Sequence, residues 1–332
     1  MPELLLLAAL CCAASTAALL RMLRPPRMGE ALVRALLATL LAAAVAVTAG
    51  RLTGGETEPF LLASAFAVAP VAVLLGGTAD EAVPGHRRVA WSLVLVWAGV
   101  VFPVCAVVPP LLFAACGSVE CRVEDFGGGL ALLVSSAASA LPAWRAPAAT
   151  EREGWGRFAV PVLVIWVSGA LWLASLEGVI DGYTPRILLA AVVAPIGGAA
   201  AWTLADFLRG APRHPLRSAA DGVLAGFVAI VPGAAGISFP WPLAVGALAG
   251  AAAALVYGSR RASSGGRAGH WALVVLTSTT VGYLAPAVWG DTVGLLFSGR
   301  IGALLPPVAA LLAVAAFGLV TSSASWALGR RR

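Results

Sequence analysis

Apolar stretches of about the length that crosses a membrane follow one another along nearly the whole chain, with the charged residues gathered between them. The hydrocarbon core of a bilayer is about 30 Å thick, so a spanning helix needs about 20 mostly apolar residues. Such stretches cover residues 3–23, 30–50, 59–77, 88–110, 126–146, 156–177, 185–208, 219–237, 240–258, 271–291 and 301–328. The pattern predicts an all-α polytopic membrane protein with eleven transmembrane helices, in a single domain over residues 1–332.

The composition agrees with a membrane location. Hydrophobic residues make up 60% of the chain and charged residues only 11%, whereas soluble domains carry about 25% charged residues. The connections between the apolar stretches are short, so no soluble domain is expected. We therefore predict a multi-pass protein of the cell (plasma) membrane, in direct contact with the lipid bilayer.

The arginines predict the orientation of the helices. With the N-terminus outside, the connections after the odd-numbered helices and the C-terminal tail are cytoplasmic and contain seventeen arginines. The opposite side contains four, Arg51, Arg122, Arg186 and Arg300. Because membrane proteins carry their excess of arginine on the cytoplasmic side, the count favours an N-out, C-in topology. This topology also accounts for the net charge of +6, so no nucleic-acid partner is expected.

The predicted membrane core carries almost no ionisable side chain. Arg34 is the exception, while His86, His214 and His270 fall in cytoplasmic connections or at the start of the tenth helix, where we interpret them as solvated. A charge at the bilayer centre costs at least about 2.5 kcal/mol, so such residues mark ion paths and proton relays. Their scarcity argues against a proton pump with a carboxylate relay. Catalytic clusters, metal-ligand spacings and cofactor motifs are also missing, so we expect no enzyme, no metal site and no cofactor.

The five cysteines fall into two groups. Cys11, Cys12 and Cys105 lie in predicted helices, where thiols pack as small apolar groups. Cys116 and Cys121 fall together in the external loop before the fifth helix, where oxidising conditions permit a disulfide. A Cys116–Cys121 disulfide and two free thiols are both open alternatives from the sequence.

A resemblance to a known family starts from DFGGGLALLVSSAASAL, residues 125–141. This stretch is similar to the fifth-helix signature of the ammonium transporter (Amt/Mep/Rh) family. A second match lies in residues 199–250, where LRG is followed by GVLAGFVAI, and weaker matches cover the first four helices. The resemblance spans nearly the whole chain. It implies an ammonium or ammonia transporter or channel, with helices 1–5 and 6–10 as inverted repeats, assembled as a homotrimer with one pore in each subunit.

The departures from the family pattern concern the pore. The family places a histidine eight residues after the aspartate that matches Asp125, and Leu133 stands there. A second pore histidine is expected in the tenth helix, where the sequence has Leu276, or Val275 if the register shifts by one. The twin histidines are therefore absent. Asp125 is retained, and both a helix-capping role and a role at the external mouth are open for it.

The resemblance assigns the remaining places along the substrate pathway. Phe66 matches the first of the two stacked pore phenylalanines, and the second falls at Leu171 or Trp172. Pro109 stands where the family has its outer tryptophan, so the cation–π contact expected for ammonium is missing there. Ser175 matches the serine that hydrogen-bonds the ion.

Two hypotheses follow for the function. The first is an ammonium or ammonia transporter or channel with an atypical mechanism, because a pore without histidines disfavours a bare cation. The alternative is a non-conducting membrane sensor or scaffold, or a channel for another small neutral solute. A continuous path of polar and small residues past Phe66 and Leu133 favours conduction, whereas a plug of Leu133, Leu276 and Trp172 favours the non-conducting protein.

Overall fold

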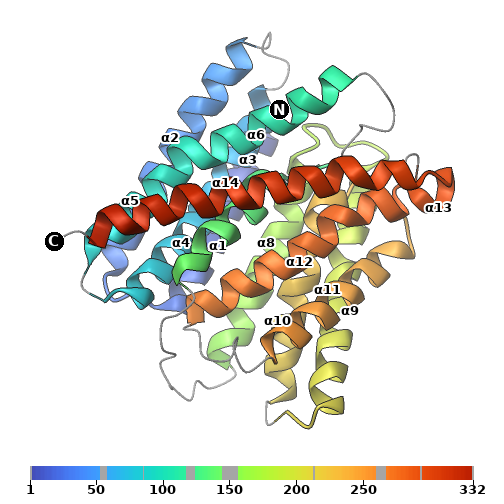
Figure 1. Cartoon of the computed structure of the whole chain (residues 1–332). Helices are drawn as coiled ribbons and strands as arrows, with labels where there is room; N and C mark the ends of the chain where they lie inside the picture. Colours follow the sequence, from blue (N-terminus) through green and yellow to red (C-terminus); the bar gives the residue numbers. More distant parts are fainter. Residues whose placement is uncertain are drawn as a thin grey trace.

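The computed structural model describes residues 2–52, 58–84, 86–116, 124–143, 156–211, 214–258, 267–291 and 294–330. In this part of the chain the regular elements are helices, and there is no β-strand (Figure 1). Nine described helices are long and apolar enough to cross a membrane, and Gly129–Ala140 and Trp241–Tyr257 are shorter apolar helices. The prediction of an all-α polytopic fold is confirmed. The exact number of crossings and their orientation stay predictions.

The first half of the chain forms five helical stretches, several of which are broken into shorter pieces. They are α1 (Pro2–Leu23), α2 (Met28–Leu52), α3 (Glu58–Phe66) with α4 (Val68–Ala82), α5 (Arg87–Val96) with η1 (Trp97–Val101) and α6 (Phe102–Cys116), and η3 (Gly129–Val134) with α7 (Ser135–Ala140) and η4 (Leu141–Ala143). The side chain of Cys116 and all of Cys121 lie outside the described residues, so the disulfide stays a prediction.

The second half begins at α8 and contains the longer uninterrupted helices. Its elements are α8 (Gly156–Ser175), α9 (Thr184–Leu208), α10 (Pro215–Ile230) with η5 (Val231–Gly233), α11 (Trp241–Tyr257), α12 (Arg267–Trp289), α13 (Leu295–Ser298), η6 (Ile301–Leu304) and α14 (Leu305–Arg330). In Figure 1 the blue and green helices of the first half and the yellow and orange helices of the second half form two groups. Helix α14 runs across both groups and contacts α5 and α7 as well as α12.

Small residues allow α9, α10 and α11 to pack with their backbones in contact. A Cβ atom added to Gly222 of α10 would lie 2.7 Å from Ala199 Cα of α9. One added to Gly250 of α11 would lie 2.5 Å from the carbonyl oxygen of Gly198. Because small residues let membrane helices approach closely, the glycines of these segments explain why the three helices form a tight group.

Arg34 is buried in an ion pair and is not an isolated charge at mid-depth. Its Nη2 lies 2.5 Å from Asp80 Oδ2 in the last turn of α4, and its side chain is 2% exposed. The pair joins the start of α2 to the end of α4. Asp80 is the counter-ion that offsets the cost of burying the charge of Arg34.

Asp206 is the centre of a buried polar cluster near the end of α9. Its carboxylate accepts hydrogen bonds from Ser218 Oγ at 2.6 Å, Trp202 Nε1 at 3.1 Å and Arg209 Nη2 at 2.6 Å. Buried carboxylates require such partners, because burial of an unpaired carboxylate costs several kcal/mol, on the order of the desolvation penalty of any buried ion. The cluster ties the end of α9 to the start of α10.

His270 is buried as well, which corrects its interpretation as a solvated residue. It is 6% exposed, its ring lies 4.1 Å from that of Tyr257, and its Nε2 lies 3.5 Å from Asp221 Oδ1. Asp221 is fully buried and also faces Arg217 Nε at 3.6 Å. His86 and His214 are exposed, as predicted. His270 differs from them because α10 and α11 pack against the first turn of α12.

Candidate functional site

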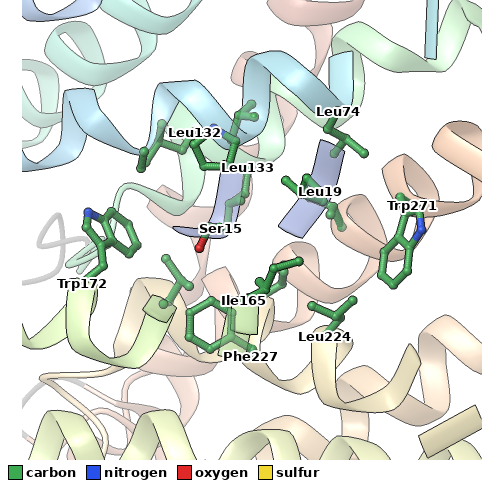
Figure 2. A pocket seen from close by; sticks show the side chains of 18 of the residues that line it. Ser15, Leu19, Leu74, Leu132, Leu133, Ile165, Trp172, Leu224, Phe227 and Trp271 are labelled. Atoms are coloured by element: carbon green, nitrogen blue, oxygen red, sulfur yellow. The ribbon is translucent and has the colours of Figure 1, made fainter. Parts of the chain in front are cut away.

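A cavity of about 140 Å³ lies between the two halves of the molecule (Figure 2). We call it the central cavity. Its wall comes from α1, α4 and η3 of the first half and from α8, α10 and α12 of the second half. These are the first, third and fifth helical stretches of each half. Two repeats related by a pseudo-two-fold axis would contribute the same positions to a shared site.

The wall of the central cavity is apolar. Figure 2 shows Leu133, Leu19 and Ile165 around the middle of the space, with Phe227 and Leu224 of α10 facing them. Among the described residues that form the wall, none carries a charge. The cavity therefore offers a cation no counter-charge, and burial of an isolated cation is far more costly than burial of a neutral molecule.

Trp172 stands at one end of the cavity and is anchored by a hydrogen bond. Its Nε1 donates to the carbonyl oxygen of Ala63 at 3.0 Å. This carbonyl is available because the third helical stretch breaks at Ala67, whose N–H donates to Ser64 O at 3.1 Å. Pro70, three residues further on, has no N–H and contributes to the break. The ring of Trp172 is thus fixed between α8 and α3.

Trp271 stands at the opposite end (Figure 2) and is 4% exposed. Its ring stacks on Phe158 of α8, with 5.2 Å between the ring centroids. Arg217 of α10 covers the Phe158 ring, with 3.7 Å between Arg217 Cζ and the ring centre, a cation–π distance. Because Arg217 also faces Asp221, this end of the cavity is connected to the buried cluster around His270.

Ser15 supplies a hydroxyl group to the wall, but the hydroxyl is already engaged. Ser168 Oγ donates to Val164 O at 2.6 Å, and Ser15 Oγ lies 2.7 Å from Ser168 Oγ. Since a serine hydroxyl has one proton, Ser15 donates to Ser168. The pair joins α1 to α8 across the centre of the molecule and leaves lone pairs of Ser15 as its remaining hydrogen-bonding capacity.

The glycines after Asp125 allow the fifth stretch to dock on η5, which continues α10. Phe126 N donates to Pro232 O at 2.8 Å and Gly127 N to Val231 O at 3.1 Å. A side chain on Gly127 would collide with Val231, and Gly128 has a left-handed φ of 70°, which glycine adopts without strain. A Cβ on Gly129 would lie 2.5 Å from Pro232 Cγ.

Asp125 caps the first turn after these glycines. Its carboxylate accepts hydrogen bonds from the backbone N–H groups of Gly129 and Leu130, the latter at 2.9 Å. Burial raises the pKa of Asp125 to about 6, although both N–H donors lower it. The carboxylate is therefore committed to the start of η3. This geometry accounts for an acid at this position by capping alone.

The predicted pathway residues divide into those at the cavity and those away from it. Leu133 and Trp172 line the cavity, and of the two places for the second histidine Val275 lines it. Leu276 is partly buried against the core and does not form part of the wall. Leu171 is 39% exposed and points away, so Trp172 is the member of that pair at the cavity.

The other predicted residues are not part of the cavity wall. Phe66 is partly buried in the core, and its neighbour Ala67 lines the cavity in its place. Pro109 is partly buried inside α6. Ser175 is buried, and its hydroxyl donates to Trp172 O at 2.6 Å on its own helix. In this structure Ser175 presents no hydroxyl to the cavity.

Sequence reasoning missed Ser15, Phe227 and Trp271, which all line the cavity. In the sequence, Trp271 is only the first residue of the apolar stretch 271–291, and nothing else distinguishes it. The apolar pattern could not identify these residues, because helices that are apolar on all sides do not reveal which side faces a cavity. Their positions depend on how α1, α10 and α12 pack together.

The fold and the cavity define a polytopic helical membrane protein with a solute-sized space between two halves. Comparison with solved structures identifies the fold as that of the Amt/Mep ammonium transporters. Candida albicans Mep2 superposes with a TM-score of 0.81 at 16% identity, over 99% of this chain and 84% of that chain. Saccharomyces cerevisiae Mep2 gives 0.73 at 13% identity, over 98% and 86%.

A third structure, described as a sensor Amt protein, gives a TM-score of 0.67 at 15% identity, over 98% of this chain and 90% of that chain. No family model and no curated protein sequence matches the chain. The resemblance noted in the sequence is thus confirmed at the level of the fold. At such identities the fold alone is established, and the function has to be argued from the site.

Proposed function

We propose that this protein is an Amt/Mep-type membrane protein that passes ammonia, or a solute equally small and neutral, through the central cavity. The observation that carries the proposal is the apolar wall of a cavity placed between the two halves of an ammonium-transporter fold. The places where the family resemblance expects histidines hold Leu133 and, at the cavity wall, Val275. The proposed solute is therefore the neutral molecule and not the ammonium ion.

The cost of entering the cavity separates the two forms of the solute. A polar molecule that loses its hydrogen bonds in an apolar site pays about 1–3 kcal/mol on protein scales. Burial of an isolated cation costs far more, since the described wall holds no carboxylate or histidine. The rings of Trp172, Trp271 and Phe227 offer only about 0.5–2 kcal/mol of cation–π attraction each, which does not offset that cost. Ammonia can also donate a hydrogen bond to the free lone pairs of Ser15. Transport should consequently carry little or no electric current.

Proteoliposomes with a trapped pH indicator test this proposal. After an ammonium pulse, the interior of vesicles with the native protein should become alkaline faster than that of empty vesicles. On a supported membrane, the same vesicles should show no current of the kind that transport of the ammonium ion would produce. Leu133→Trp fills the cavity and should reduce the rate to that of empty vesicles. Leu171→Trp adds the same ring to a residue that points away from the cavity, so it should behave as the native protein does.

The companion variant Leu133→His introduces an imidazole at the place where the family resemblance expects one. If the protein passes neutral ammonia, this variant should add an ammonium current to the alkalinisation. A robust current in the native protein would contradict the proposed mechanism. An alkalinisation that is identical in native, Leu133→Trp and empty vesicles would contradict conduction through the cavity.

A second candidate is a membrane sensor that conducts no solute. Two observations favour it: one of the superposed structures is described as a sensor Amt protein, and the bulky apolar side chains of Leu133 and Trp172 both stand in the cavity wall. Under this hypothesis native vesicles show neither alkalinisation nor current. Ammonium would instead change the fluorescence of the tryptophans at the two ends of the cavity.

The proposal includes a homotrimer in the cell membrane, built from one domain per subunit, with ammonia as the solute and no enzymatic activity. These points rest on the likeness to ammonium transporters and on the apolar helices. Native mass spectrometry of the protein released from nanodiscs tests the trimer. A monomer under conditions that preserve other membrane oligomers would overturn that part of the proposal.

A further inference from the structure

We propose that the central cavity is a binding site for one small apolar molecule, of the size range from xenon to benzene. The cavity measures about 140 Å³, is partly open, and has no charge on the described residues of its wall. Apolar protein cavities of about 150 Å³ remain dry and bind benzene or xenon. This inference concerns occupancy of the cavity and holds whether or not the protein conducts ammonia.

Water is a poor occupant of this cavity. A buried water molecule needs about 2–4 polar partners. Ser15 is the wall residue with a hydroxyl, and its proton is directed to Ser168. The indole N–H of Trp172 is likewise directed to Ala63 O, away from the cavity. Among the described wall residues, a water molecule would therefore find the acceptor of Ser15 and the weakly polar thiol of Cys12, and no second strong hydrogen-bond partner close to the middle of the space.

The cavity also resists collapse, so an apolar guest recovers contacts that the wall otherwise lacks. Trp172 is held by its hydrogen bond to α3. Trp271 is held by its stack on Phe158 of α8. Arg217 of α10 covers the Phe158 ring. Wall atoms next to an empty space lose dispersion contacts outright. A guest without hydrogen-bonding groups restores these contacts and loses no hydrogen bonds to water when it enters. The ligand class is therefore small, uncharged and apolar.

Xenon is the probe for the test, because it is spherical, apolar and observable by its own NMR resonance. The full chain is placed in lipid nanodiscs, and the xenon shift is followed against pressure, with empty nanodiscs to correct for uptake by lipid. The native protein should show a saturable component beyond that of lipid. Leu133→Trp, which fills the cavity, should abolish it, whereas Leu171→Trp, on the exposed side of α8, should retain it.

A second filling variant guards against misfolding of the first. Val275→Phe adds less volume at another wall residue of α12, and both variants are checked by gel filtration before use. The proposal requires loss of the saturable component in every folded filling variant. A native signal no larger than that of empty nanodiscs overturns it, and so does an equal signal in native and folded filling variants, which would place xenon elsewhere.

Discussion

The ion pair between Arg34 and Asp80 gives a prediction whose size follows from its burial. Arg34 is 2% exposed and Asp80 17%, with 2.5 Å between Nη2 and Oδ2. The guanidinium packs so closely on α4 that a Cβ on Gly76 would lie 3.2 Å from Arg34 Cζ. Arg34 is therefore enclosed, and replacing Asp80 by leucine leaves its charge buried without a counter-ion.

The expected loss can be estimated in two ways. Charges about 4 Å apart attract by about 4 kcal/mol at an effective dielectric constant of about 20. Removal of one partner from a buried ion pair costs about 3–5 kcal/mol in measured cases. Both routes predict that Asp80→Leu lowers the free energy of unfolding by about 4 kcal/mol. Replacing both residues, as in Arg34→Met with Asp80→Leu, should recover most of this loss, because no charge then remains buried.

Unfolding in mixed micelles, followed by circular dichroism over an SDS titration, measures these free energies as a double-mutant cycle. The matched control is Glu30→Gln, which removes the partner of Arg87, an arginine that is 56% exposed. An exposed pair is worth at most about 1 kcal/mol. Equal losses for Asp80→Leu and Glu30→Gln, or a double variant no more stable than Asp80→Leu, would refute the assignment of Arg34 as a buried, paired charge.

Two further predictions concern the tight helix group and the capping carboxylate. Gly246→Leu places a side chain against Ala194 O of α9 and should prevent recovery of folded protein in gel filtration, whereas Gly182→Ala, with nothing within 4 Å of the added atom, should be neutral. Because the pKa of Asp125 rises from 3.8 to about 6 in the folded state, the folded protein binds more protons than the unfolded chain between those values. Its stability should therefore fall as the pH rises through that window, and Asp125→Asn should lessen this fall in thermal midpoints.

The helical architecture could be predicted from the sequence because two simple signals agree. Apolar stretches of spanning length locate the helices. The low content of charged residues agrees with their burial in a membrane. The structure also explains why residues 127–129 are glycines. Backbone approach to Val231 and Pro232 excludes side chains there, and Gly128 adopts a positive φ.

The site could be predicted only in part, because it depends on rotation of helices about their axes. One residue changes the direction of a side chain by about 100°, which is the difference between Trp172 at the cavity and Leu171 facing outward. The same rotation brings Val275 and not Leu276 to the wall. The burial of His270 had no local signal, since Asp221 and Tyr257, which enclose it, come from two other helices.

The residues that pack the helices and the residues that line the cavity are different, so likeness to ammonium transporters in the fold does not extend by itself to the chemistry of the pore. Contacts such as those of Gly198 and Gly222 act on the backbone and fix how the helices pack, whatever lines the pore. Leu133 and Val275 line the cavity, and they can be aliphatic without disturbing those backbone contacts. A chain can consequently keep the transporter fold while its cavity selects against the cation. Under the proposed function, the wall of the central cavity, and not the fold, determines which solute passes.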